Sequence, residues 1–395
     1  MRTQTCTSSA FSHLHWKDTS AMSSLTTSIP ATEPGAGSSG SAPYPFDYEG
    51  WKRISDSGAF RILADSALSS SHRIRDTAAR MRELGYAGED PGLLFAVATH
   101  LASTITSILR FGSPELKSAL VPDLLSGHFV GAHAITETGA GSDVSSMQAT
   151  ATVDEASGKV RVNGRKVFIT NAPIASHVVV YARTYRGGND EGISAYVIDT
   201  TCPGVAVTAN HITASLPHSP IGELELSDVT IPQSWRLGAE GAGLQVLDFV
   251  MKREIIYAFS ADLGRAQKRI EDSVAFANSR RQFNSLLAEF QSVSFAIADM
   301  YVRHFAGTAM INEILSKIEN NQDITKEVAA AKILISDANL QTAIEATHLR
   351  GAKGVQADST SVQDVLDALA GPIYSGTNRI QKTRIAAMLG LLTDG

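Results

Sequence analysis

The chain has 395 residues, of which 43% are hydrophobic and 19% charged, as is ordinary for a globular enzyme of two or three domains. Its net charge of −6 argues against a nucleic-acid-binding surface, which needs clustered lysine and arginine. Cys6 and Cys202 have no paired spacing and the histidines are scattered, so we expect no disulfide framework, no metal site and a reducing, cytoplasmic location. No apolar run approaches the roughly 18 residues of a membrane helix, so we expect no membrane-spanning segment.

Residues 1–45 are rich in serine, threonine, alanine, glycine and proline. Such a segment cannot bury enough apolar surface to order itself, so we predict a disordered tail. A signal peptide is the alternative interpretation. It is disfavoured because the segment has no apolar central region and a single arginine, Arg2, at its start.

Residues 46–130 are predicted to form an amino-terminal helical domain, because apolar residues recur at steps of three and four between Leu93 and Ile105. In residues 131–235 the hydrophobic pattern changes to the two-residue period of β-strands, which predicts a small barrel or sandwich. Within them, Val160–Ile169 is interpreted as two short strands around a tight turn at Asn163 and Gly164. Further strand-like runs follow at His177–Arg183, Ile193–Ile198, Val205–Ala209 and Glu223–Leu226.

Residues 236–395 return to the helical period, with breaks near Asn320, Gly351 and Gly371. We predict a carboxy-terminal domain of four long helices. The fold class is therefore mostly α with a central β domain.

Five segments carry a resemblance to a known family. They occur in the order Ala134–Val144, Lys166–Asn171, Ser279–Phe283, Glu289–Gln291 and Ile373–Gln381. From about residue 80 to residue 392 the chain resembles the FAD-dependent acyl-CoA dehydrogenases. The resemblance implies a helical, β, helical architecture and a bound FAD.

The resemblance also implies a set of cofactor contacts. Thr136 and Phe168 match positions beside the flavin ring, although Phe168 is also interpretable as a core strand residue. Arg280 and Phe283 match a block that reaches the FAD of a neighbouring subunit, which implies a homotetramer or at least a dimer; an exposed arginine at a helix end is the alternative. The implied cofactor-binding residues are His133, Ile135, Thr136, Gly141, Ser142, Phe168, Thr170, Arg280, Phe283, Gln291, His348, Gly351, Ala352, Thr377 and Arg379.

Ser375 stands where most of the family carries the glutamate that acts as catalytic base. A serine hydroxyl cannot take a proton from carbon without a base beside it. Members that resemble isovaleryl-CoA dehydrogenase carry the base on the first long carboxy-terminal helix, where the matching residue is Glu254. Its neighbours on the helix face are apolar and include no cation, so we expect a raised pKa. A surface glutamate on an oligomer interface is the alternative.

The implied reaction is α,β-dehydrogenation of an acyl thioester carried by coenzyme A or by an acyl carrier protein, with electron-transfer flavoprotein or another acceptor taking the electrons. The amino-terminal segment resembles a branch that serves secondary metabolism. Ser375 is expected to contribute only its backbone N–H, and the expected substrate-binding residues are Ser142, Tyr257, Tyr374 and Gly376. A flavin monooxygenase or oxidase and a degenerate flavin-binding protein are the competing interpretations.

Overall fold

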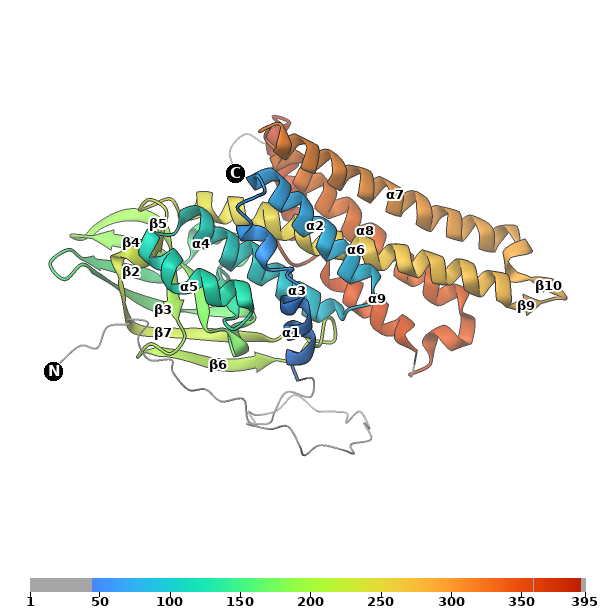
Figure 1. The fold of residues 1–395 in the computed structure, drawn as a ribbon, viewed down its shortest axis with the longest axis horizontal. Coiled ribbons are helices and arrows are strands. Elements are labelled where there is room, and N and C mark those ends of the chain that lie inside the picture. The colour runs from blue at the N-terminus through green and yellow to red at the C-terminus, as the bar shows by residue number, and fades with distance from the viewer. Residues whose placement is uncertain (1–44, 358, 392–395) are drawn as a thin grey trace.

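The structure is a computed structural model that describes residues 45–357 and 359–391. The tail predicted for residues 1–45 lies outside these residues except for its last member. Figure 1 shows a sheet at one end of the molecule, long helices that extend away from it, and shorter helices packed across both. The predicted fold class, mostly α with a central β domain, is confirmed.

The first helices form a layer against both the sheet and the long helices. Asp47 and Ser113 cap two of them by accepting hydrogen bonds from backbone N–H groups in the first turn. The helices are α1 (Tyr48–Asp56), α2 (Ser70–Tyr86), α3 (Pro91–Thr99), the π-helix η2 (His100–Ile105), α4 (Thr106–Phe111) and α5 (Pro114–Ser126).

The segment Pro91–Phe111, made of α3, η2 and α4, is a buried rod at the centre of the molecule. Its most apolar 18-residue window has a mean hydropathy of 1.6. By length and composition this helix could span a membrane, so the expectation that no apolar run reaches membrane length is wrong. Because 83% of that window is buried inside the structure, its apolar character is accounted for by the core.

The sheet contains eight strands in the order β6-β7-β3-β2-β4-β5-β8, with β1 paired in parallel to β4. The strands are β1 (Gly131–Ala134), β2 (Thr150–Asp154), β3 (Lys159–Thr170), β4 (His177–Arg186), β5 (Asn189–Asp199), β6 (Val205–His211), β7 (Ile221–Pro232) and β8 (Arg236–Leu237).

One expectation for this region is wrong. Asn163 and Gly164 do not form a hairpin turn, because β3 continues through them and pairs with β2 and β7, with a register shift at this point. Gly164 is needed for a close approach, since a Cβ there would lie 2.6 Å from the Cβ of Ala149.

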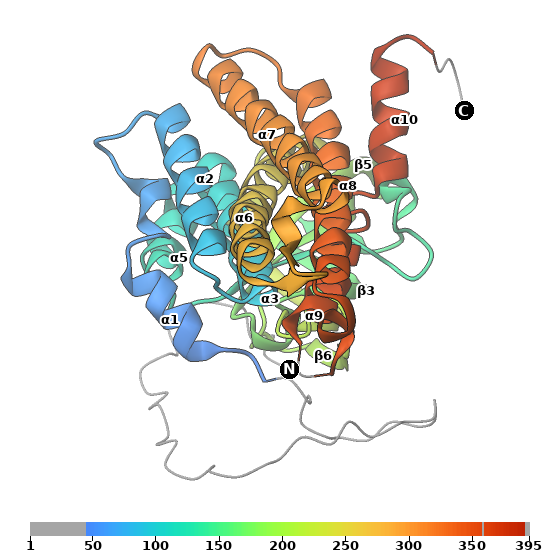
Figure 2. The same cartoon turned by 90° about the vertical axis from the view of Figure 1, so that its right-hand side faces the viewer.

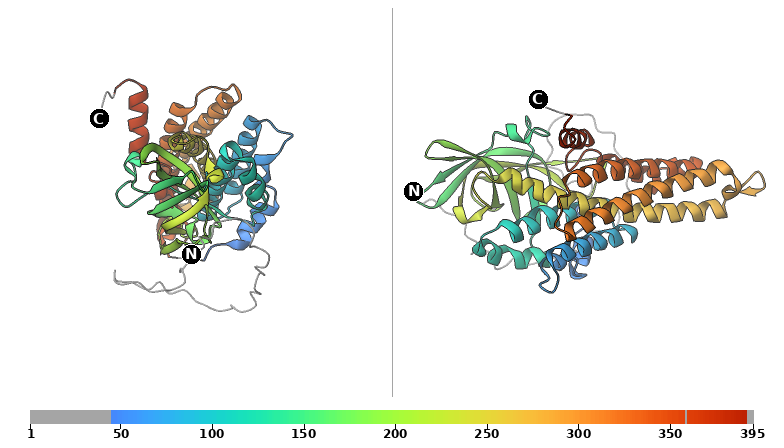
Figure 3. Two further views of the ribbon diagram at one scale, coloured as in Figure 1. Left: turned by 90° about the vertical axis from the view of Figure 1, so that its left-hand side faces the viewer. Right: turned by 90° about the horizontal axis from the view of Figure 1, so that it is seen from above.

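Three long helices and two short ones follow the sheet. They are α6 (Gly243–Ser279), α7 (Gln291–Glu319), α8 (Thr325–Leu349), α9 (Thr360–Ala370) and α10 (Asn378–Met388). The ends of α7, α8 and α9 coincide with the predicted breaks. Between α6 and α7, the short strands β9 (Arg281–Gln282) and β10 (Ser285–Leu286) form a hairpin at the far tip of the molecule (Figures 1 and 3).

Helix α6 connects all parts of the fold. It starts beside the sheet, packs against α2, α7 and α8, and ends at the distant hairpin (Figure 2). Glycines bring α2 and α6 close: a Cβ on Gly264 would lie 2.0 Å from the carbonyl oxygen of Arg82, and one on Gly85 would lie 2.1 Å from that of Ala261.

Gly264→Ala is therefore expected to destabilise the protein by about 1–3 kcal/mol, because the added methyl group forces α2 away from α6. Urea unfolding measures the change. Gly139→Ala is a control, since a Cβ there meets no atom within 4 Å. If the two variants were equally stable, the close contact between α2 and α6 at Gly264 would not be needed for stability.

Candidate active site

Glu254 is a buried carboxylate on α6, with 6% of its surface exposed. Its Oε1 accepts a hydrogen bond of 2.5 Å from the Ser375 hydroxyl, and its Oε2 accepts one of 2.9 Å from the Ser103 hydroxyl. Burial raises the pKa of Glu254, and the hydrogen bonds from the two serines oppose the rise. No lysine or arginine forms an ion pair with Glu254 in the described part of the chain. Such a carboxyl group is poised to exchange a proton.

Ser103 is a member of the site that the sequence analysis did not identify. It lies in η2, where the widened helical turn places its hydroxyl against α6. Segments of π-helix occur frequently at functional sites. The sequence does not single it out, because the same segment carries four other buried polar residues, Thr99, His100, Thr104 and Ser107.

The loop between α9 and α10 holds Ser375 in an unusual backbone conformation. Ser375 has a φ of +52° and Gly376 a φ of +81°. A left-handed backbone is unfavourable for serine and is found most often where function requires it. Gln381 fixes the loop by donating a hydrogen bond of 3.2 Å to the Ser375 carbonyl oxygen. Within the described residues the N–H of Ser375 donates to no protein acceptor, so it is available to a ligand.

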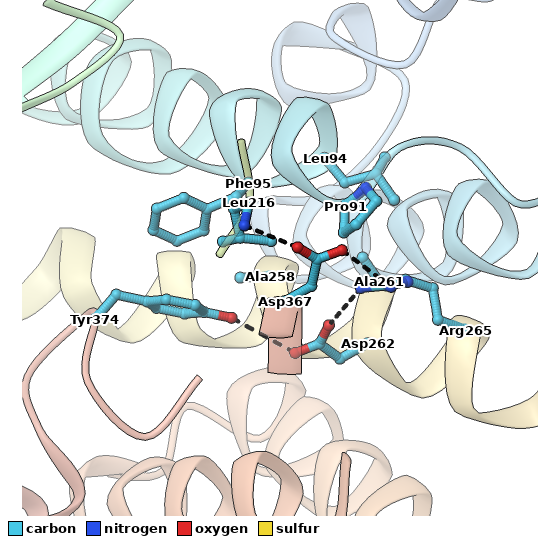
Figure 4. Close-up of a pocket in the computed structure, with 10 residues that line it drawn as sticks. All are labelled: Pro91, Leu94, Phe95, Leu216, Ala258, Ala261, Asp262, Arg265, Asp367 and Tyr374. Carbon is cyan, nitrogen blue, oxygen red and sulfur yellow. Dashed lines mark hydrogen bonds and ion pairs between the residues drawn. The ribbon is translucent and has the colours of Figure 1, made fainter. Parts of the chain in front are cut away.

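A pocket opens beside this loop (Figure 4). Its space, including the open mouth, is about 320 Å³. Tyr374 forms one wall and lies between two aromatic rings, with its centroid 4.2 Å from that of Phe95 and 5.5 Å from that of Phe259. The lining residues are Pro91, Leu94, Phe95, Leu216, Ala258, Ala261, Asp262, Arg265, Asp367 and Tyr374.

Two of the expected substrate residues lie away from this pocket. Tyr257 does not line it, since its side chain is fully buried and its hydroxyl lies near Thr77 and Thr106. Ser142 is exposed in the loop that follows β1. Of the substrate residues that the sequence predicted, the structure places Tyr374 in the pocket and Gly376 in the loop beside it.

A buried hydrogen bond connects the Glu254 region to β1. His133 on β1 and Tyr181 on β4 are joined by a contact of 2.9 Å between Nε2 and the phenolic oxygen. Burial, together with the nearby charge of Glu254, raises the pKa of Tyr181. Burial lowers the pKa of His133 to about 3, so this imidazole is neutral at physiological pH. The structure thus brings the predicted base and the predicted flavin-facing strand into one region.

Thr136 and Phe168, the two predicted flavin-ring residues, lie on adjacent segments. The N–H of Val167 donates a hydrogen bond of 2.9 Å to the Thr136 carbonyl oxygen. Phe168 has a φ of +56° and is 64% exposed, with its ring stacked 4.8 Å from that of His211. The alternative interpretation of Phe168 as a core residue is therefore wrong. An exposed aromatic ring beside a half-buried threonine fits a flat, aromatic cofactor such as a flavin.

A buried ion pair lies beneath these two segments. Lys166, with none of its side chain exposed, donates hydrogen bonds to Glu137 (2.8 Å) and to the Ile135 carbonyl oxygen (3.0 Å). Burial raises the pKa of Glu137, but the hydrogen bonds from Lys166 and from the N–H groups of Gln148 and Ala149 bring it below its ordinary value. The pair fixes the backbone from which Thr136 projects.

The remaining predicted cofactor residues do not gather around Glu254 within one subunit. Gly141 is exposed in the loop after β1, and Thr170 ends β3. Arg280 ends α6, and Phe283, 91% exposed with a φ of +52°, lies at the tip of the hairpin. The other positions are Gln291 at the start of α7, His348, Gly351 and Ala352 at the end of α8, and Thr377 and Arg379 at the start of α10. Of these, Thr377 follows Ser375 by two residues and so is near Glu254 in the chain fold.

Comparison with known proteins identifies the class. The acyl-CoA dehydrogenase middle domain matches residues 132–229, and the acyl-CoA dehydrogenase C-terminal domain matches residues 241–390. An L-prolyl-[peptidyl-carrier protein] dehydrogenase from Serratia sp. is 36% identical over 80% of this chain and 81% of its own length. An acyl-CoA dehydrogenase from Bacillus subtilis is 32% identical over 75% of this chain and 78% of its own length.

Solved structures agree with these sequence matches. The prolyl acyl carrier protein oxidase AnaB has a TM-score of 0.82 and 30% identity, covering 88% of this chain and 92% of that one. PigA with FAD and proline has a TM-score of 0.82 and 34% identity, covering 88% and 90%.

The chain belongs to the acyl-CoA dehydrogenase family. It is accordingly an oxidoreductase that uses FAD, as the resemblance implied.

Proposed function

We propose that this enzyme introduces a double bond between the α- and β-carbons of an acyl thioester, with Glu254 as the base that removes the α-proton. The observation that carries the proposal is the buried carboxylate of Glu254 beside the Ser375 loop. Among the residues that the structure describes, this carboxylate has no cationic partner and the Ser375 N–H has no acceptor. Anaerobic addition of acyl thioesters to the purified holoenzyme tests it, since oxidation of the substrate bleaches the flavin absorbance.

The side chains divide the work between proton transfer and charge stabilisation. Glu254 accepts the α-proton, and its raised pKa brings its basicity closer to the operating pH than that of an exposed glutamate. The Ser375 N–H donates to the thioester oxygen as negative charge develops there, an interaction worth about a hundredfold or more in rate. FAD, when bound beside Thr136 and Phe168, supplies the acceptor for the hydride that leaves the β-carbon.

The hydroxyl groups of Ser103 and Ser375 hold the carboxylate of Glu254 in place while no substrate is present. Donation from two hydroxyls favours the ionised form and so limits the rise in pKa that burial causes. We propose that the serine pair keeps Glu254 ionised and oriented until the acyl group enters.

The carrier of the acyl group is proposed to be the phosphopantetheine of a carrier protein. The relatives from Serratia and AnaB are named for prolyl groups on carrier proteins, which supports this choice over coenzyme A. We expect the same acyl group to bleach the flavin with a higher kcat/KM from a carrier protein than from coenzyme A. Stopped-flow absorbance with both thioesters measures the ratio, and a preference for coenzyme A would contradict the assignment of the carrier.

Phe168 offers a test of the cofactor site. Its ring is exposed, so Phe168→Ala is expected to leave the unfolding of the apoprotein unchanged while weakening FAD binding by about two- to tenfold, since one aromatic stacking contact is worth about 0.5–1.5 kcal/mol. Fluorescence titration of the apoprotein with FAD gives the affinity. Tyr185→Ala, at a half-buried aromatic on β4, is the matched control.

The electron acceptor distinguishes two candidate functions. AnaB is named an oxidase, which favours oxygen as a second candidate beside an electron-transfer flavoprotein. Rapid reoxidation of the reduced enzyme in air supports the oxidase, whereas slow reoxidation supports the dehydrogenase.

We also propose a homotetramer, or at least a dimer. Phe283 is 91% exposed at the hairpin tip, and α7 carries further exposed apolar side chains. A helix with several exposed large apolar side chains is typical of an interface. The residues on α7 are Phe295, Tyr301, Val302 and Phe305.

A further inference from the structure

The pocket beside the Ser375 loop has in its wall a carboxylate, that of Asp262, which the proposed chemistry does not use. Ala258, Ala261 and Asp262 follow Glu254 by four, seven and eight residues, so they lie on the same side of α6. Asp262 is therefore about 12 Å further along the helix axis than Glu254. Ala258, Ala261 and Asp262 all line the pocket, whereas Glu254 lies one helical turn before Ala258.

Asp262 is nearly buried but weakly partnered. Its side chain is 13% exposed, and its hydrogen bond from the Tyr374 hydroxyl measures 3.5 Å. Arg265 lies 3.9 Å from it, because that guanidinium makes its close contact of 2.8 Å with Asp364. Figure 4 shows the Asp262 carboxylate between the Tyr374 hydroxyl and Arg265 at the pocket wall. Burial raises the pKa of Asp262 to about 6, and the two nearby arginines oppose the rise.

The charges around this end of the pocket do not balance. Asp262, Asp364 and Asp367 supply three carboxylates, whereas Arg265 and Arg269 supply two guanidinium groups, which leaves one negative charge unmatched. Asp90 and His218, in contact at 2.9 Å, form a separate pair nearby and add no positive excess. Burial of an unmatched charge is unfavourable unless a ligand supplies the opposite charge.

Asp367 is already satisfied and does not compete for such a ligand. Its Oδ1 accepts hydrogen bonds from the Leu216 N–H (2.8 Å) and from the Gln363 side chain (2.7 Å), and its Oδ2 lies 3.8 Å from Arg265. The carboxylate with free capacity at the pocket is thus the one on Asp262.

We propose that Asp262 binds a protonated amino group at the far end of the acyl chain, so that the substrate class is an ω-aminoacyl thioester. This inference rests on the proposed function and extends it to the specificity of the same site. The apolar walls made by Leu94, Phe95 and the ring of Tyr374 suit the methylene groups, and Asp262 suits the terminal ammonium. A purely alkyl chain of the same length would leave the carboxylate with only its long contacts to Tyr374 and Arg265.

Two probes of equal heavy-atom count test the proposal: 5-aminopentanoyl pantetheine and hexanoyl pantetheine. The holoenzyme carrying Glu254→Gln binds both without turnover, so its flavin spectrum reports affinity alone. We expect the amino compound to bind at least tenfold more tightly, and we expect Asp262→Asn in the same background to abolish or reverse this preference. Asn has the shape of Asp, and FAD content together with circular dichroism verifies the fold of each variant.

Equal affinities in the protein with Asp262 intact, or a preference that survives Asp262→Asn, would overturn the inference. Ser359→Ala, at a helix cap away from the pocket, is the matched control and is expected to leave both affinities unchanged. Flavin bleaching by the wild-type enzyme tests the proposed dehydrogenation separately from the role of Asp262. If neither thioester bleaches the flavin, the proposed function fails, while the binding preference still decides the role of Asp262.

Discussion

Glu254→Gln is expected to slow anaerobic flavin bleaching by acyl thioesters by at least about a hundredfold, because glutamine keeps the shape of glutamate but cannot accept the α-proton. FAD content should be unchanged, since the residues that fit the cofactor lie on β1, β3 and the loop between β1 and β2. Stopped-flow absorbance under anaerobic conditions measures the rate. Bleaching at the wild-type rate would exclude Glu254 as the base.

Ser375→Ala is the matched control. It removes a hydroxyl that donates to Glu254 but keeps the backbone N–H that is proposed to bind the thioester oxygen. A much smaller loss of rate is therefore expected. The variant also lacks one hydrogen bond that lowers the pKa of Glu254, so that pKa should rise further.

The dependence on pH follows from the same carboxyl group. Glu254 must be ionised to act, so the wild-type bleaching rate should fall as the pH decreases through the pKa of Glu254. Because burial raises that pKa, the midpoint should lie above the ordinary value of 4.5 for glutamate. In Ser375→Ala the midpoint should move to still higher pH.

Lys166→Met is expected to lower the free energy of unfolding by about 3–5 kcal/mol, since removal of one member of a buried ion pair leaves the other charge uncompensated. Glu137, 8% exposed, would retain only the hydrogen bonds from the N–H groups of Gln148 and Ala149. FAD binding should weaken as well, because Lys166 also anchors the Ile135 carbonyl oxygen beside Thr136. Urea unfolding and FAD titration measure the two effects.

The double variant Lys166→Met, Glu137→Gln should recover part of the lost stability, because no buried charge then remains unpaired. Arg80→Met, which removes one member of the exposed pair between Arg80 and Glu83, should change stability little. If Lys166→Met were no more destabilising than Arg80→Met, the pair beneath the flavin-facing segments would have no structural importance.

Much of the fold could be predicted from periodicity and breaks in the sequence. The glycine and asparagine positions near Asn320, Gly351 and Gly371 mark the ends of α7, α8 and α9, because the helical pattern is interrupted there. The turn predicted at Asn163–Gly164 was wrong, because β3 pairs with β2 on one edge and with β7 on the other. This pairing outweighs the turn preference of two residues.

Site residues could be predicted where the pattern of a single helix or a single motif identified them. Burial of Glu254 followed from the apolar face of α6. For Phe168 the motif implied a position beside the flavin ring, and its exposed ring is contrary only to the alternative of a core residue. Ser103 and Asp262 were missed. Their importance depends on contacts between separate helices, which the spacing of residues along one helix does not report.

The most direct test of the central claim is an experimental structure of the Glu254→Gln holoenzyme with a bound acyl thioester. The account predicts the substituted side-chain amide at position 254 against the α-carbon and the Ser375 N–H within hydrogen-bond distance of the thioester oxygen. A thioester whose α-carbon lies beside another acidic residue, with position 254 remote from it, would contradict the account.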